Sequence, residues 1–212
     1  MEITWYGLSC FRLTERGAAT IVTDPYSPEI GPAELKLKAD VVTVSHEAPG
    51  HSYLSAVKGY RRVIDGPGEY EIGDVFITGI HMEPKSKKGN GKSNTLYVFE
   101  YDGFTLAHLG DLAYVPSQSQ IEALGTVDVA MVPVGGGTAL APSKAAEVIS
   151  LIEPSVVIPM HYKTGKEGPK LEAVSRFLKE MGIEALEPEE SLKLTKSDLS
   201  EETQVILLAP AG

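Results

Sequence analysis

The feature that most constrains this chain is an apolar strand that ends in histidines. Residues Val41–His51 read VVTVSHEAPGH, so a β-branched run passes almost directly into His46. Pro49 and Gly50 then predict a short turn before His51. A strand that stops and presents imidazoles at its carboxyl end is a common way to place metal ligands. The fold therefore has to bring this loop to a sheet edge where other polar side chains can meet it.

Two further predicted strands end in residues of the same kind. Phe104–His108 leads to Asp111, and Ser155–Met160 leads to His161. Side chains on the loops at one edge of a sheet can converge although they lie far apart in the sequence. Together with His51 they would form a set of two histidines and one aspartate, which suits Zn²⁺, Fe²⁺ or Mn²⁺ and leaves positions open for water.

The order of predicted elements indicates the fold class. Strands dominate the first half, and strands alternate with helices in the second half. The expected strands are Ile3–Tyr6, Cys10–Thr14, Thr20–Thr23, Arg61–Ile64, Tyr70–Ile72, Val75–Ile80, Asn94–Tyr101, Phe104–His108, Val127–Val132, Ser155–Met160, Leu192–Leu194 and Gln204–Leu208. The expected helices are Pro116–Leu124, Pro142–Ile152 and Lys170–Met181, with one or two helical turns in Ser52–Lys58. Mixed sheets with helices outside satisfy this order, and one solution is the predicted α+β (αββα) fold, a four-layer sandwich of two mixed β-sheets flanked by helices. No linker divides the chain, so residues 1–212 form a single predicted domain.

Composition restricts the expected classes of binding partner and the expected cellular location. A formal net charge of −10 argues against nucleic acid or an anionic membrane, and we expect a small-molecule substrate or ligand, with a homo-oligomer left open. Cys10 is the one cysteine, so no internal disulfide forms, and we expect it in the core. No signal peptide and no run of ~20 apolar residues is evident, so the expected location is cytoplasmic.

The histidine loop resembles the signature of the metallo-β-lactamase superfamily, His-x-His-x-Asp-His. The match is incomplete. His46 stands at the first histidine position and His51 at the last. Ala48 replaces the second histidine, and Gly50 replaces the aspartate.

Other segments resemble the branch of Zn-dependent hydrolase-like proteins that includes an ascorbate-phosphate lactonase. The similar segments are TWYGLSCF near the N-terminus, Thr23–Pro25, Ala107–Asp111, Pro133–Gly136 and Ile158–Tyr162. They occur in the family's order and span nearly the whole chain. That branch usually carries a histidine where this chain has Leu8.

The resemblance implies a depleted metal site. Such proteins hold one ion with the first two loop histidines and a third histidine, and Ala48 cannot ligate. Their second ion uses the loop aspartate, the last loop histidine, a bridging aspartate and a final histidine. Gly50 stands at the position of the loop aspartate, so that ligand is missing, whereas His51, Asp111 and His161 remain. We expect one ion at most, zinc or another divalent transition metal, with His46 as an added ligand, or none.

Further site residues follow from the same segments. Asp24 and His46 are candidates for proton transfer, although Asp24 could instead cap a turn or orient the histidine loop. His81, His108 and Tyr162 are candidates for substrate contact. As alternatives, His108 could support the ligands from behind, His81 could be an ordinary strand histidine, and Tyr162 could lie on the surface.

Two functions remain open. The first is a metal-dependent hydrolase that acts on an ester, lactone or phosphoester. The second is a catalytically inactive, metal-free member of the fold that binds a ligand or protein partner in the remnant pocket. Glu83–Ser93, with Lys85, Lys87 and Lys88 close together before Gly-Asn-Gly, is predicted to be a mobile hairpin tip or a basic lid. The run Gly135–Gly137 predicts a tight turn near the pocket.

Overall fold

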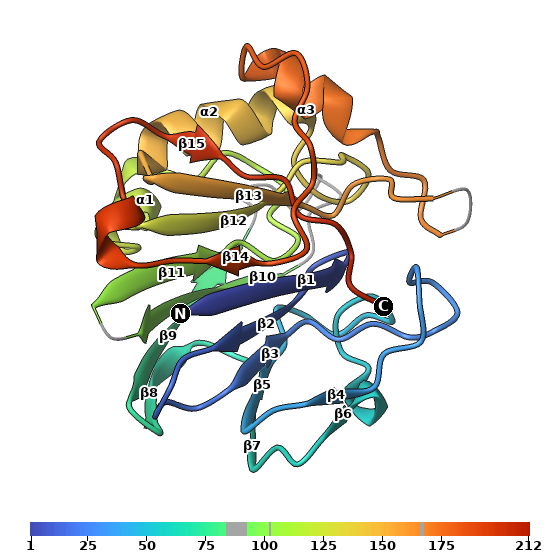
Figure 1. The fold of residues 1–212 in the computed structure, drawn as a ribbon, viewed down its shortest axis with the longest axis vertical. Coiled ribbons are helices and arrows are strands. Elements are labelled where there is room, and N and C mark those ends of the chain that lie inside the picture. Colours follow the sequence, from blue (N-terminus) through green and yellow to red (C-terminus); the bar gives the residue numbers. More distant parts are fainter. Residues whose placement is uncertain (84–92, 102, 166–167) are drawn as a thin grey trace.

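The computed structural model describes residues 1–83, 93–101, 103–165 and 168–212. The chain forms two mixed β-sheets that enclose the main core, with helices on the outside (Figure 1). The predicted α+β sandwich is confirmed. The predicted hairpin tip or lid within Glu83–Ser93 falls almost wholly outside the described residues.

The first sheet has six strands, in the order β14-β1-β2-β3-β5-β7. Their bounds are β14 Leu192–Lys193, β1 Glu2–Gly7, β2 Cys10–Thr14, β3 Ile21–Thr23, β5 Val41–Thr43 and β7 Arg62–Ile64. Pairs among β14, β1, β2 and β3 are antiparallel, whereas β3, β5 and β7 run parallel. The loops that leave β3 and β5 therefore start from the same edge.

The second sheet has seven strands, in the order β15-β13-β12-β11-β10-β9-β8. Their bounds are β15 Gln204–Val205, β13 Val156–Met160, β12 Val129–Pro133, β11 Phe104–His108, β10 Asn94–Tyr101, β9 Val75–Met82 and β8 Gly68–Ile72. Strands β15, β13, β12 and β11 are parallel, and β10, β9 and β8 continue as antiparallel hairpins. The carboxyl ends of β11 and β13 consequently meet at one edge.

Three helices accompany the second sheet: α1 Gln118–Glu122, α2 Pro142–Ile152 and α3 Val174–Glu180. Helices α2 and α3 pack against each other on its outer side (Figure 1). Helix α2 starts with Pro142, whose missing N–H costs nothing in a first turn, and buries Ala145, Val148 and Ile149. Helix α3 starts four residues later than predicted, because Glu172 N donates to Gly135 O and Lys163 N donates to Glu172 O.

The layer outside the six-stranded sheet consists mainly of extended chain. It comprises β4 (Leu37–Lys38), the 3₁₀ turn Leu54–Ala56 and β6 (Val57–Lys58). Leu35 and Leu37 are buried, whereas Lys36 and Lys38 are exposed. This period of two suits a strand and not a helix. A second, smaller apolar cluster lies beneath this layer and includes Cys10, as expected for a core thiol.

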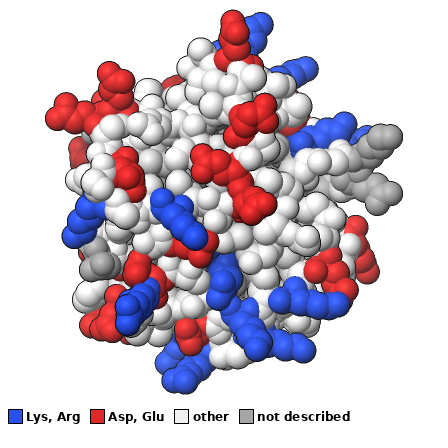
Figure 2. Space-filling model, viewed as in Figure 1, with Lys and Arg blue, Asp and Glu red and all other residues white. Residues whose placement is uncertain are grey.

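Figure 2 shows Lys and Arg side chains gathered toward the lower edge of the molecule, around the part of Figure 1 that holds β4, β6 and β7. Asp and Glu are more widely spread over this face. Within the described residues, no helix has the length and apolar character needed to span a membrane.

Candidate metal centre

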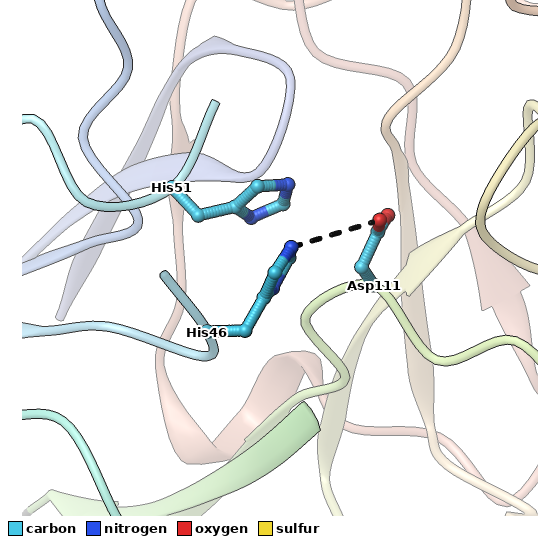
Figure 3. Close-up of side chains that lie close together, drawn as sticks. All are labelled: His46, His51 and Asp111. Atoms are coloured by element: carbon cyan, nitrogen blue, oxygen red, sulfur yellow. Dashed lines mark ion pairs between the residues drawn. The ribbon is translucent and has the colours of Figure 1, made fainter. Parts of the chain in front are cut away.

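Loops from both sheets meet at one point between the carboxyl ends of their strands. His46 and His51 follow β5, Asp111 follows β11, and His161 follows β13 directly. Figure 3 shows the imidazoles of His46 and His51 turned toward the Asp111 carboxylate. One donor atom from each of these three residues lies within 4.8 Å of the other two. The structure thus brings together side chains that are far apart in the sequence.

The spacing of the donor atoms suits a single ion. His161 Nε2 lies 3.4 Å from Asp111 Oδ1, and His46 Nε2 lies 4.0 Å from Asp111 Oδ2. Two ligands at ~2.0–2.1 Å from a tetrahedral zinc lie about 3.3 Å apart. The rings of His46 and His51 have centroids 4.2 Å apart, and those of His51 and His161 are 5.5 Å apart. Three of these side chains, His46, His51 and Asp111, therefore offer a donor set of suitable chemistry within the reach of one ion, and His161 lies beside the other oxygen of Asp111, outside this group.

Each imidazole is held through its Nδ1 atom. His51 Nδ1 lies 2.8 Å from Asp24 Oδ2, and His46 Nδ1 lies 3.1 Å from Ser45 Oγ. His161 Nδ1 lies 3.2 Å from Ser9 Oγ. Such contacts fix ring orientation in metal-binding histidines and leave Nε2 for the ion.

The carboxylate of Asp111 lies close to all three histidines. Its Oδ2 accepts a hydrogen bond of 2.6 Å from Thr138 Oγ1, and its backbone N donates to Asn94 Oδ1 at 2.9 Å. Its Oδ1 is buried and accepts no hydrogen bond from any residue that the structure describes. A buried carboxylate oxygen that accepts no hydrogen bond is unfavourable, and a cation bound between it and His161 would satisfy it.

The charges at the site favour cation binding. Burial raises the pKa of Asp111, but His161, His51, Thr138 and His46 outweigh it, so the pKa is lowered and the carboxylate is ionised at neutral pH. Burial lowers the pKa of His161 to about 4, despite the opposing effect of Asp111. His161 is therefore neutral at pH 7 and its ring can donate a lone pair.

Asp24 supports the site from behind. It is fully buried, and it follows β3 in a left-handed conformation with φ of 40°. Burial opposes ionisation, but its pKa is lowered overall by His51, His108 and Ser45. Its carboxylate contacts His51 and accepts hydrogen bonds from Ser45. Asp24 thus orients the histidine loop, which is one of the three roles that the sequence left open for it.

The backbone is strained on both sides of the site. His161 has φ of 52° and Leu8 has φ of 47°, in a region that L-residues rarely occupy. The two residues are linked, because His161 N donates to Leu8 O at 3.0 Å, and Trp5 Nε1 donates to the same carbonyl. Backbone strain of this kind is commonly found at functional sites, where the surrounding structure maintains it.

The three predicted substrate contacts lie outside this donor set. His108 is fully buried, with Nε2 2.9 Å from Ser9 O, so it supports the site from the core. Tyr162 is also buried, against Trp5 and with its hydroxyl near Leu208 O. His81 lies on β9, where its half-exposed ring is 3.4 Å from Glu83 Oε1.

Several residues of the site were not singled out from the sequence. These are Ser9, Ser45, Asn94 and Thr138. A hydroxyl residue beside a histidine, as in Ser45–His46, is a weak signal, because serines are common in turns. Thr138 follows the run Gly135–Gly137, which does form a turn close to the site, as predicted. A Cβ at Gly135 would lie 2.2 Å from His161 O, so only glycine allows this approach.

Gly50, which stands where the signature motif has an aspartate, has apolar neighbours. A Cβ on Gly50 would lie 3.3 Å from Ile30 Cδ1 and 3.9 Å from Leu8 Cδ1. Leu8 is buried, and Ala48 carries no donor atom. Among the residues that the structure describes, the contacts at Gly50 are therefore apolar, in contrast to the three histidines that lie around Asp111.

Two mixed sheets with a polar cluster at the carboxyl ends of their strands define a protein of the metallo-β-lactamase fold. A family model described as "Beta-lactamase superfamily domain" matches residues 2–161. A UPF0173 protein of Pyrococcus abyssi is 30% identical over 77% of this chain and 84% of its own length. The chain therefore belongs to the β-lactamase superfamily and, within it, to the UPF0173 family.

Other comparisons agree with this assignment. A UPF0173 metal-dependent hydrolase of Methanoculleus marisnigri is 29% identical over 77% of this chain and 82% of its own. A solved structure of a metallo-β-lactamase superfamily protein from Thermotoga maritima is 39% identical, with a TM-score of 0.80 over 98% of this chain and 97% of that one. Igni18 of Ignicoccus hospitalis, at 20% identity and a TM-score of 0.68 over 92% of this chain and 99% of that one, shares the fold.

Proposed function

We propose that this protein is a metal-dependent hydrolase with one divalent transition-metal ion. The observation that carries the proposal is the convergence of His46, His51 and Asp111, with His161 beside the second oxygen of Asp111. The orphaned Asp111 Oδ1 supports a cation at this point. The name of the Methanoculleus marisnigri relative, a metal-dependent hydrolase, supports the same class.

The residues divide into ligands and supports. Asp111, His51, His161 and His46 would hold the ion, and zinc suits their nitrogen and oxygen donors. Such an ion lowers the pKa of bound water from ~15.7 to about 7 and so supplies hydroxide near neutral pH. Asp24 keeps His51 in place, and Ser9 does the same for His161. The ester, lactone or phosphoester of a small molecule is the proposed substrate.

A second candidate is a metal-free protein that binds a ligand in the same place. The apolar contacts around Gly50 favour it, because they occupy the side on which the motif would supply an aspartate. That aspartate would contribute to proton transfer, a step that general bases typically accelerate ~10²–10⁴-fold. Metal content separates the two candidates.

Protein purified without added metal should contain a transition metal, or take up close to one equivalent of Zn²⁺ in a calorimetric titration. Asp111→Asn should weaken this binding by at least about tenfold, because it removes the charge shared by the histidines. Asp128→Asn is the matched control, since Asp128 accepts a hydrogen bond from Thr105 N elsewhere in the sheet.

Each result of the titration points to a different conclusion. Content below about a tenth of an equivalent, with no uptake on titration, would overturn the hydrolase proposal in favour of the metal-free candidate. Uptake that both asparagine variants retain would place the ion elsewhere. With metal loaded, chromogenic esters, lactones and phosphoesters then identify the bond that is cleaved.

A further inference from the structure

We propose that Ser45 is a positioning residue. Its hydroxyl donates a hydrogen bond to Asp24 and accepts one from His46 Nδ1, which fixes the tautomer of the His46 ring. The inference rests on the proposed function, since the consequence is an Nε2 lone pair available to an ion. It concerns a contact that the ligand set alone does not require, and its main readout needs no metal.

The geometry around the Ser45 hydroxyl decides where its proton goes. Ser45 Oγ lies 2.6 Å from Asp24 Oδ2 and 3.1 Å from His46 Nδ1. A hydroxyl has one proton and two lone pairs. The ionised carboxylate is the stronger acceptor, and an O–H···O⁻ distance of about 2.5–2.7 Å is typical of a charge-assisted hydrogen bond. The Ser45 proton therefore points at Asp24.

The hydroxyl can then act toward His46 only as an acceptor. A contact of 3.1 Å requires that His46 Nδ1 carries a hydrogen and donates it. In the neutral ring the lone pair is then on Nε2, the atom that lies 4.0 Å from Asp111 Oδ2. Asp24 contacts His51 Nδ1 directly at 2.8 Å, so one buried carboxylate orients two imidazoles, one of them through a serine.

The surroundings leave Ser45 little freedom to turn away. Ser45 N donates to Asp24 Oδ1 at 2.7 Å, and Ser45 O accepts from Thr95 N at 2.8 Å. Its side chain faces Gly110 so closely that a Cβ there would lie 2.6 Å from Ser45 Cβ. Ser45 is 3% exposed, and Asp24 is not exposed at all. Water has little access to compete for these contacts.

The test reads the tautomer of His46 in the metal-free protein by long-range ¹H–¹⁵N NMR of its imidazole, near pH 8. Wild type should show the Nδ1–H form. Ser45→Ala should shift His46 toward the Nε2–H form, and Ser45→Thr, which keeps a hydroxyl, should restore it. Ser52→Ala is the matched control, because Ser52 Oγ lies in the same loop but donates to Ala48 O.

Metal affinity provides a second readout. Ser45→Ala should weaken Zn²⁺ binding by about 10–100-fold, the usual effect of losing a partner behind a ligand, and Ser52→Ala should not. A wild-type ring in the Nε2–H form would overturn the inference without any variant, as would an unchanged tautomer in folded Ser45→Ala. If wild type takes up no metal, the proposed function fails, whereas the NMR result still decides the role of Ser45.

Discussion

At the scale of single residues, the site depends on how the two oxygens of Asp111 are used. Thr138 occupies Oδ2, and Oδ1 is left facing His161. A carboxylate held by one fixed donor presents its other oxygen in one direction, which pre-organises it for an ion. Thr138 is thus more than a surface residue, and it comes from the loop that follows β12, the parallel neighbour of the strand that leads to Asp111.

Replacing Thr138 with valine should reveal this role. The side chain keeps its shape but loses the donor, so Asp111 can rotate and Zn²⁺ affinity should fall by about tenfold. Thr14→Val is a suitable comparison, because Thr14 Oγ1 donates to Glu2 O outside the site. Calorimetric titration of both variants provides the measurement. Equal affinities would mean that Asp111 needs no help from Thr138.

At the scale of elements, strand ends explain both what the sequence could predict and what it could not. Apolar runs that stop at polar residues are visible in the sequence alone, and they correctly identified the strands that lead to His46, Asp111 and His161. The start of α3 was placed too early, because the backbone of Glu172 bonds to Gly135 and Lys163 in other loops and the local pattern does not show this. For the same reason the partners Ser9 and Asn94 were missed, since their importance comes from residues distant in the sequence.

The turn after β11 provides a test at this scale. Gly110 has φ of 55°, and a Cβ there would lie 2.5 Å from Asn94 Oδ1 and 2.6 Å from Ser45 Cβ. Gly110→Ala should cost ~1–2 kcal/mol for the left-handed backbone and a further ~1–3 kcal/mol for the clash. Denaturant unfolding measures the sum.

Gly125→Ala isolates the backbone part of that cost. Gly125 has φ of 68°, and a Cβ there meets no atom within 4 Å. It should therefore lose only the ~1–2 kcal/mol of the backbone contribution. Equal losses in the two variants would show that the Ser45–Gly110–Asn94 contact relaxes without strain.

At the scale of the whole molecule, both sheets are needed to build one site. The six-stranded sheet provides Asp24, His46 and His51, and the seven-stranded sheet provides Asp111 and His161. The order of elements predicted this sandwich. The extended layer over the first sheet could not be predicted. Its strands β4 and β6 have two residues each, and only their pairing with each other defines them as strands. Closing the sandwich buries ionisable groups from both halves, so its stability depends on pH.

The direction of that dependence follows from His161. Its folded pKa of about 4 lies below the ordinary histidine value of 6.5, so between these values the unfolded chain binds more protons. Stability in chelator should therefore be lost as pH falls from about 6.5 toward 4, by up to about 1.4 kcal/mol per pH unit for this group. The lowered pKa values of Asp24 and Asp111 contribute in the same direction at still lower pH. Denaturant unfolding from about pH 7 to 4.5 should show His161→Gln with a shallower slope than wild type, and parallel slopes would mean that His161 is protonated in the folded protein.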